Sequence, residues 1–186
     1  RRHVLMLHPH TVIVYDELEA SEAVRWEWLL HSPTEFKMDA TKKTLSTNNK
    51  AKGWGAVTQL FGGHVFTLFQ TDRFVVPPAI TGAEYPNQWH LTARVDGCSA
   101  TRFLAIIQVG DEAVSIINRD GDTFNVGDWT IKAVLDASKA PELTVSHRTE
   151  QAVFSYGTDN PALNGNFYSR QFTGSSLLYD EIDGAY

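Results

Sequence analysis

The sequence has little cysteine, no long apolar run and no cluster of basic residues, and each absence excludes a class of protein. Cys98 is the single cysteine among 186 residues, so no internal disulfide can form, which excludes a disulfide-stapled scaffold. No apolar stretch approaches the roughly 20 residues of a transmembrane helix, which excludes a membrane span of that kind. The net charge is −6 and the basic residues are scattered, which argues against binding nucleic acid through its phosphates.

The chain also lacks an initiator methionine, and its first apolar stretch is too short for a signal peptide. We therefore expect it to begin within a larger protein. The remaining composition, 42% hydrophobic and 20% charged, is ordinary for a globular protein of a size that can bury a core.

Period-two alternation of apolar and polar residues runs through the chain, and helical periodicity is nearly absent. We expect strands at 11–15, 24–31, 64–70, 89–95, 102–109, 113–117, 129–135, 143–146, 152–156 and 175–181. Residues 38–53 form a long hairpin or a surface loop. Asp96-Gly97 and Asp120-Gly121 predict tight hairpins, since glycine accepts the positive φ that such turns require. The fold class is thus all-β, an antiparallel two-sheet β-sandwich forming one domain over residues 1–186.

The alternation also assigns side chains to faces. In 24–31 the core side carries Val24, Trp26, Trp28 and Leu30, and the outward side carries Arg25, Glu27, Leu29 and His31. Inward sets are also expected for the later strands, namely Trp89, Leu91, Ala93 and Val95, then Phe103, Ala105, Ile107 and Val109, then Trp129, Ile131, Ala133 and Leu135. Core packing therefore accounts for most of the tryptophans. Trp54, between two glycines in a loop-like setting, and Tyr85 are the candidates for stacking on a sugar.

Candidate catalytic groups are few. His8 and His10 share a strand face and are either half of a zinc site or histidines at a strand end beside a turn. Asp16-Glu17 and Asp180-Glu181 are neighbours that point to opposite faces, so neither pair makes a glycosidase-like carboxylate pair. We interpret them as solvated acids at strand ends. No phosphate-binding loop, nucleophile elbow or Cys/His dyad is present, so no catalytic or cofactor-binding residue is assigned.

Three ordered segments carry a family resemblance, and they read Arg2-His3-Val4-Leu5, Val12-Ile13-Val14-Tyr15-Asp16-Glu17-Leu18-Glu19-Ala20 and Trp26-x-Trp28-Leu29-Leu30-His31-Ser32. Two later stretches, 88–92 and 102–107, also fit. Together they resemble heparinase II/III-type polysaccharide lyases, and most of all the heparinase II branch. The similarity ends near residue 107, and the remainder matches the β-rich C-terminal region of that family without a sharp motif.

The resemblance implies that the chain is the non-catalytic C-terminal β portion of a lyase whose α/α toroid precedes it. Such enzymes cleave uronic-acid-containing, glycosaminoglycan-like polysaccharides by β-elimination, in the bacterial periplasm or outside the cell. The family's catalytic Tyr and His come from the toroid and from an early strand in a His-Asn context, which His8-Pro9-His10 does not match. The branch also carries a structural zinc held by two histidines and an aspartate. His31 matches one of those histidines, and the other ligands would lie upstream of Arg1.

Two other functions are kept beside this one. A stand-alone carbohydrate-binding module would use Trp54 and Tyr85, and would need at least two coplanar exposed rings. A structural or interaction sandwich would bind no ligand. If the chain belongs to a lyase, the outward residues Arg25, Glu27 and His31 are expected to form an exposed patch that packs against the catalytic portion.

Overall fold

The computed structural model describes residues 1–39, 41, 43–49, 53–73, 88–110, 115–149, 154–158, 162–163 and 166–167. Every regular element in these ranges is a β-strand. The strands are β1 Arg2–Leu7, β2 Thr11–Ser32, β3 Lys37–Asp39, β4 Thr44–Asn49, β5 Trp54–Gly62, β6 Thr67–Thr71, β7 Trp89–Val109, β8 Ile117–Asp120, β9 Thr123–Val126, β10 Trp129–Ala133, β11 Leu143–His147, β12 Phe154–Tyr156, β13 Ala162–Leu163 and β14 Asn166–Phe167. Within this part of the chain no helix is long and apolar enough to cross a membrane.

The strands form two antiparallel sheets, so the predicted fold class is confirmed. The first sheet has the order β1-β2-β7-β5-β4-β3, with β6 also pairing to β7, and the second has the order β14-β13-β12-β11-β10-β9-β8. Residue contacts divide the chain into two compact units, one with residues 2–115 and 135–137 and the other with the remaining described residues. The single domain over residues 1–186 stays a prediction.

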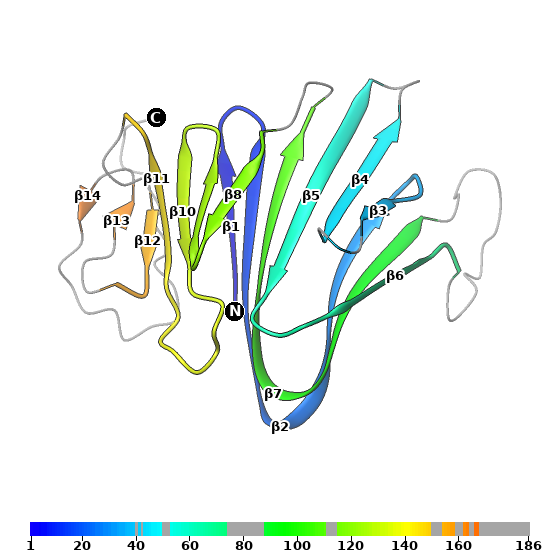
Figure 1. Cartoon of the computed structure of the whole chain (residues 1–186), viewed down its shortest axis with the longest axis horizontal. Coiled ribbons are helices and arrows are strands. Elements are labelled where there is room, and N and C mark those ends of the chain that lie inside the picture. The colour runs from blue at the N-terminus through cyan, green and yellow to red at the C-terminus, as the bar shows by residue number, and fades with distance from the viewer. Residues whose placement is uncertain are drawn as a thin grey trace, which may run out of the picture. The chain divides into compact units, whose positions relative to one another are not determined.

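Two strands of the first sheet are much longer than expected. β2 joins the predicted strands 11–15 and 24–31, and β7 joins 89–95 and 102–109. The two pair along nearly their whole length and curve together at the bottom of Figure 1. Each therefore contributes two arms to the sheet, one on either side of the curve.

The hairpin predicted at Asp96-Gly97 is wrong, because both residues lie inside β7. The pairing with β2 shifts there, since Val24 pairs with Cys98 whereas Trp26 pairs with Val95. One extra residue on β7 is the arrangement of a β-bulge, and the positive φ of Gly97, 72°, serves that bulge. The positive φ predicted for Gly97 is therefore confirmed, whereas the chain reversal predicted at this position is wrong.

A hydrogen bond shows how far the curve goes. The indole Nε1 of Trp28 donates to Asp16 Oδ2 over 3.0 Å, although both residues belong to β2. A straight strand would hold positions twelve residues apart at a distance of about 40 Å. The strand therefore folds back on itself, and its two arms face each other across a shared core.

Apolar side chains from both arms fill that core. Trp28, Leu91, Ala93 and Val95 come from one arm, and Leu60, Phe103 and Ala105 come from the other, all at most 4% exposed. The inward faces predicted for 24–31 and 89–95 are confirmed. In the arm 102–109 the opposite face is buried as well, as Leu104 and Ile106 show, and Val109 is 46% exposed, against the prediction for that residue.

Of the two alternatives for residues 38–53, a hairpin or a surface loop, the hairpin is present: β3 pairs with β4, and Leu45 on β4 is buried. In the second sheet the hairpin predicted at Asp120-Gly121 joins β8 to β9, with Gly121 at a φ of 58°. Ile131 and Ala133 of β10 are buried as predicted, and Trp129 is half-buried. The strand predicted at 175–181 lies outside the described residues.

Candidate functional site

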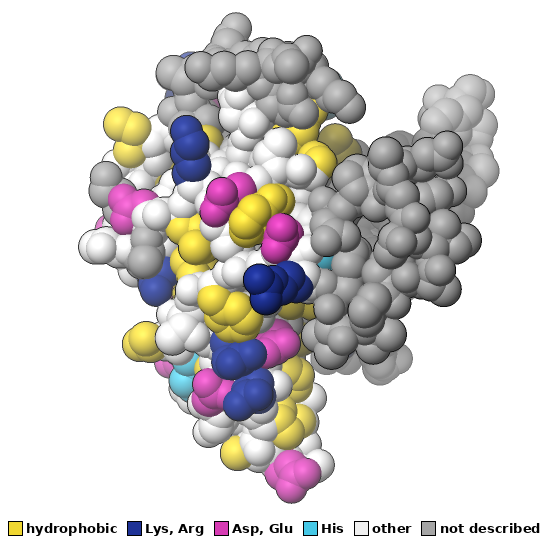
Figure 2. Space-filling view, turned by 90° about the vertical axis from the view of Figure 1, so that its right-hand side faces the viewer, with side chains coloured by type: hydrophobic (Ala, Val, Ile, Leu, Met, Phe, Trp, Pro, Cys, Tyr) yellow, Lys and Arg dark blue, Asp and Glu magenta, His cyan; other side chains and the backbone are white. Residues whose placement is uncertain are grey.

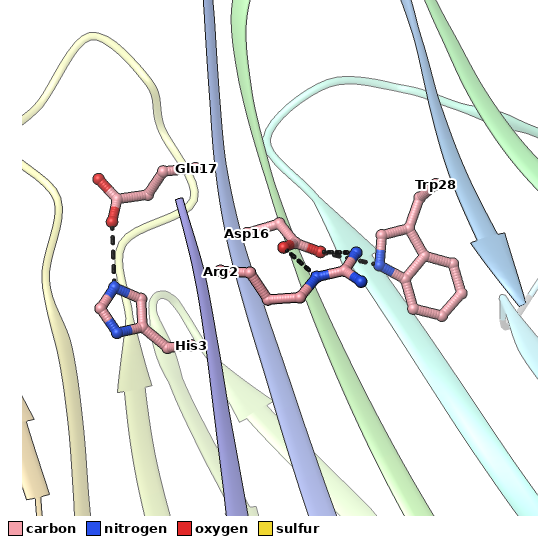
Figure 3. A network of polar contacts seen from close by, with 5 residues as sticks. All are labelled: Arg2, His3, Asp16, Glu17 and Trp28. Carbon is pink, nitrogen blue, oxygen red and sulfur yellow. Dashed lines mark hydrogen bonds and ion pairs between the residues drawn. The ribbon is translucent and has the colours of Figure 1, made fainter. Parts of the chain in front are cut away.

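Arg2 and Trp28 both bind the carboxylate of Asp16, and the three residues come from the three segments that carry the family resemblance (Figure 3). Arg2 donates from Nε to Oδ1 over 2.7 Å and from Nη2 to Oδ2 over 2.8 Å, and Trp28 donates from Nε1 to Oδ2. Asp16 and Trp28 are buried, whereas the Arg2 side chain is 57% exposed. We refer to these three residues as the Asp16 network.

The register of the strands explains the Asp16 network. Arg2 lies directly opposite Asp16 in the β1–β2 pair, so the two side chains share a face. A guanidinium matches a carboxylate with two parallel hydrogen bonds, which are stronger than neutral ones. The hydrogen bond to Asp16 raises the pKa of Arg2 above its ordinary value, partial burial opposes this, and the charge of Asp16 adds to the increase.

Glu17 points to the other face of β2, as predicted for a neighbour of Asp16. Its Oε1 lies 3.3 Å from Nε2 of His3, and both side chains are largely buried. The interpretation of Asp16 and Glu17 as solvated acids at a strand end is wrong, because both lie within β2. The signal that could have placed Asp16 was Trp28, since a buried indole N–H needs an acceptor.

The Asp16 network stabilises the fold and does not provide a catalytic group. Asp16 accepts from three N–H groups, which leaves a buried carboxylate committed to holding β1 and both arms of β2 together. A general base has to reach a substrate proton, and this carboxylate is buried and already engaged.

A second candidate site is the exposed side of the arm made by β2, β7 and β6, which we call the outer face. Its residues are Arg25, Glu27, Leu29 and His31 on β2, His90, Arg94 and Asp96 on β7, and Thr67, Phe69 and Thr71 on β6; His90 and Arg94 are half-buried, and Thr92 between them is buried. The four β2 residues were predicted to point outward, and all four are exposed, which confirms the face assignment. Figure 2 shows acidic and basic side chains interleaved with hydrophobic ones along this side of the molecule.

Arg94 is the best-held group of the outer face. Its Nε and Nη2 donate to Oε1 of Glu27 over 3.0 and 2.7 Å, and its guanidinium carbon lies 4.6 Å from the centre of the Phe69 ring. Arg25 pairs with Asp96 over 2.7 Å. The hydrogen bond to Asp96, followed by its charge, raises the pKa of Arg25. Opposite charges thus compensate each other locally.

His31, the predicted zinc ligand, is exposed on the outer face. It pairs across strands with His90, and the two rings meet edge to face with centres 4.5 Å apart. Among the described residues no group of three or more His, Cys, Asp and Glu side chains could hold a metal ion. The zinc that the resemblance implies needs three protein ligands, and the described residues do not bring three together around His31.

Zinc is therefore expected to leave the melting temperature of the chain unchanged. Two imidazoles with no third ligand among the described residues bind the ion too weakly to stabilise the fold at low micromolar metal. Thermal melts with and without zinc, beside a His31→Ala control, check this. A rise of several degrees that disappears in His31→Ala would show that the chain holds the metal by itself.

Trp54, His8 and His10, which were also singled out from the sequence, lie apart from the outer face. Trp54 begins β5 and pairs with Asn49, so the loop expected around it is wrong, and its ring is half-buried. Tyr85 lies outside the described residues. His8 and His10 are exposed in the turn between β1 and β2. The sequence reasoning missed Phe69, which the alternation Thr67-x-Phe69-x-Thr71 places outward.

No family model matches the chain, and no curated protein is significantly similar to it.

Proposed function

We propose that this chain is the non-catalytic β-sandwich portion of a polysaccharide lyase. The enzyme degrades uronic-acid-containing, glycosaminoglycan-like polysaccharides by β-elimination in the bacterial periplasm or outside the cell. An α/α toroid supplies the base and the acid, and the β portion supports that catalytic domain and contacts the polysaccharide. A structural zinc belongs to the whole enzyme, with ligands beyond those described here.

The convergence at Asp16 is the observation that supports this proposal most. Arg2, Asp16 and Trp28 come from the three segments that resemble the heparinase II branch, and all three join in one network. If the segments resemble the family because they form the same pair of curved strands, their residues should contact one another. Segments that match by chance should lie apart in the structure. The contact between the segments supports the proposal.

The stand-alone carbohydrate-binding module has less support. A stacking platform needs at least two coplanar exposed rings, and among the residues with a described burial Phe69 is the one exposed Phe, Tyr or Trp. Trp54 is half-buried at the end of a strand. The lyase portion is therefore the function we retain.

An assay of the chain alone tests its non-catalytic role. Incubated with hyaluronan, chondroitin or alginate, the chain is expected to produce no rise in the ultraviolet absorbance of unsaturated uronate ends. A commercial lyase on the same polymers serves as the positive control. Steady product formation that scales with the concentration of this chain would mean that it contains a complete active site.

A further inference from the structure

We propose that the outer face is a binding surface for a polysaccharide chain, with Arg94 and Phe69 at its centre. This rests on the proposed function, because it assigns to one surface the polysaccharide contact of that β portion.

The outer face presents its groups in rows across three strands. Glu27, Arg94 and Thr67 stand side by side, then Leu29 and Phe69 on either side of the buried Thr92, and then His31, His90 and Thr71. Rows two residues apart along a strand are about 7 Å from each other. From the ion pair of Arg25 to the histidines the surface is about 20 Å long, enough for several sugar rings in a line.

The chemistry of these rows fits sugars. Carboxylate, guanidinium, imidazole and hydroxyl groups donate to or accept from sugar hydroxyls, and a guanidinium also pairs with a uronate carboxylate. The apolar faces of sugar rings pack on exposed carbon surface, which Leu29 at 50% exposure and Phe69 at 38% provide.

The groups are held in place before any ligand arrives. Glu27 and the Phe69 ring fix the guanidinium of Arg94, and the rings of His31 and His90 restrain each other. Long side chains that are already ordered lose less conformational entropy on binding, which favours affinity.

A polymer fits this face better than a protein domain does. The centre of a protein interface is depleted of charged residues, and burying ion pairs costs desolvation energy. The pairs Arg94–Glu27 and Arg25–Asp96 would both have to be covered. A polysaccharide leaves them partly hydrated and replaces the lost water with its own hydroxyls. The outer face therefore suits substrate rather than the catalytic domain that the sequence led us to expect there.

Affinity electrophoresis through gels containing hyaluronan, alginate or neutral dextran tests the proposal. Retardation by at least one uronate polymer is expected, and Phe69→Ala and Arg94→Gln should each weaken it about tenfold. Arg148→Gln is the matched control, because Arg148 forms an exposed ion pair with Asp128 in the other unit. Thr71→Glu, an exposed substitution that places a negative charge against the uronate, serves as a second variant if Arg94→Gln does not fold.

The outcomes separate the surface from the function. Absence of retardation, or retardation that survives both Phe69→Ala and Thr71→Glu, would overturn the binding surface. Equal loss in Arg148→Gln would also overturn it, by indicating general charge attraction. A third test introduces Leu29→Cys together with Cys98→Ser into the polypeptide encoded by the whole gene and measures labelling of the new cysteine by a maleimide. Protection of that cysteine from labelling would show that a protein domain covers the outer face instead. The lyase assay is independent of this test. Uronate cleavage by the whole-gene polypeptide without retardation of this chain would contradict the binding surface and leave the proposed function standing.

Discussion

Replacement of Asp16 by alanine is expected to lower the free energy of unfolding by about 3 kcal/mol. The substitution leaves the indole N–H of the buried Trp28 without its acceptor and removes both hydrogen bonds from Arg2. An orphaned buried donor costs about 1–3 kcal/mol, and the charged bonds add to this. The exposed Arg2 recovers part of its loss by hydration, so the sum stays below that of a fully buried pair. Urea denaturation followed by tryptophan fluorescence measures the change.

Two milder variants of the Asp16 network act as controls. Asp16→Asn keeps an acceptor for Trp28 and loses the charge, so about 1 kcal/mol is expected. Arg2→Gln leaves the Trp28 bond intact and removes a half-exposed partner, with a similar cost. If Asp16→Ala were no more destabilising than Arg2→Gln, the bond between the two arms of β2 would not hold the curve.

Replacement of Gly63 by alanine is expected to destabilise the chain by about 3 kcal/mol or more. A Cβ at this position would overlap the carbonyl oxygen of Leu135, and the backbone N–H of Gly63 is bonded to the Arg102 carbonyl on its other side. The glycine is thus held between two backbone segments, neither of which can move like a flexible side chain. Arg102 also donates to the Asp136 carbonyl, which fixes the same approach.

Gly97→Ala is the matched control for the Gly63 substitution. Gly97 has a φ of 72°, and no atom lies within 4 Å of a Cβ built there. Its replacement adds only backbone strain, about 1–2 kcal/mol. Thermal and urea unfolding of both variants measure the two changes in the free energy of unfolding. Equal destabilisation by the two substitutions would mean that Gly63 and the Leu135 carbonyl are not in close contact.

The strands could be predicted from the sequence because burial has a period of two along them. That is why the inward set Trp28, Leu91 and Val95 and the outward set Arg25, Glu27 and His31 were assigned correctly. The curve could not be predicted, because a glycine at positive φ marks a bulge and a hairpin alike. Only the pairing of β7 with β2 on both sides of Gly97 distinguishes them.

The candidate sites were predicted less well than the fold. His31 was found through its motif, but its neighbour His90 depends on strand register, which no local pattern reveals. Asp16 looked like a surface acid because its partners lie 14 residues before it and 12 after it. The contact with Arg2 depends on the register of the β1–β2 pair, and the contact with Trp28 forms only because β2 folds back on itself.

The lyase assay of the polypeptide encoded by the whole gene tests the central claim most directly. It is run on hyaluronan, chondroitin and alginate, beside this chain at equal concentration, with unsaturated uronate ends as the readout. We predict product from the whole-gene polypeptide on at least one polymer and none from this chain. Product from this chain alone, or no product from the whole-gene polypeptide on any of the three, would contradict the assignment of a non-catalytic β portion of a uronate polysaccharide lyase.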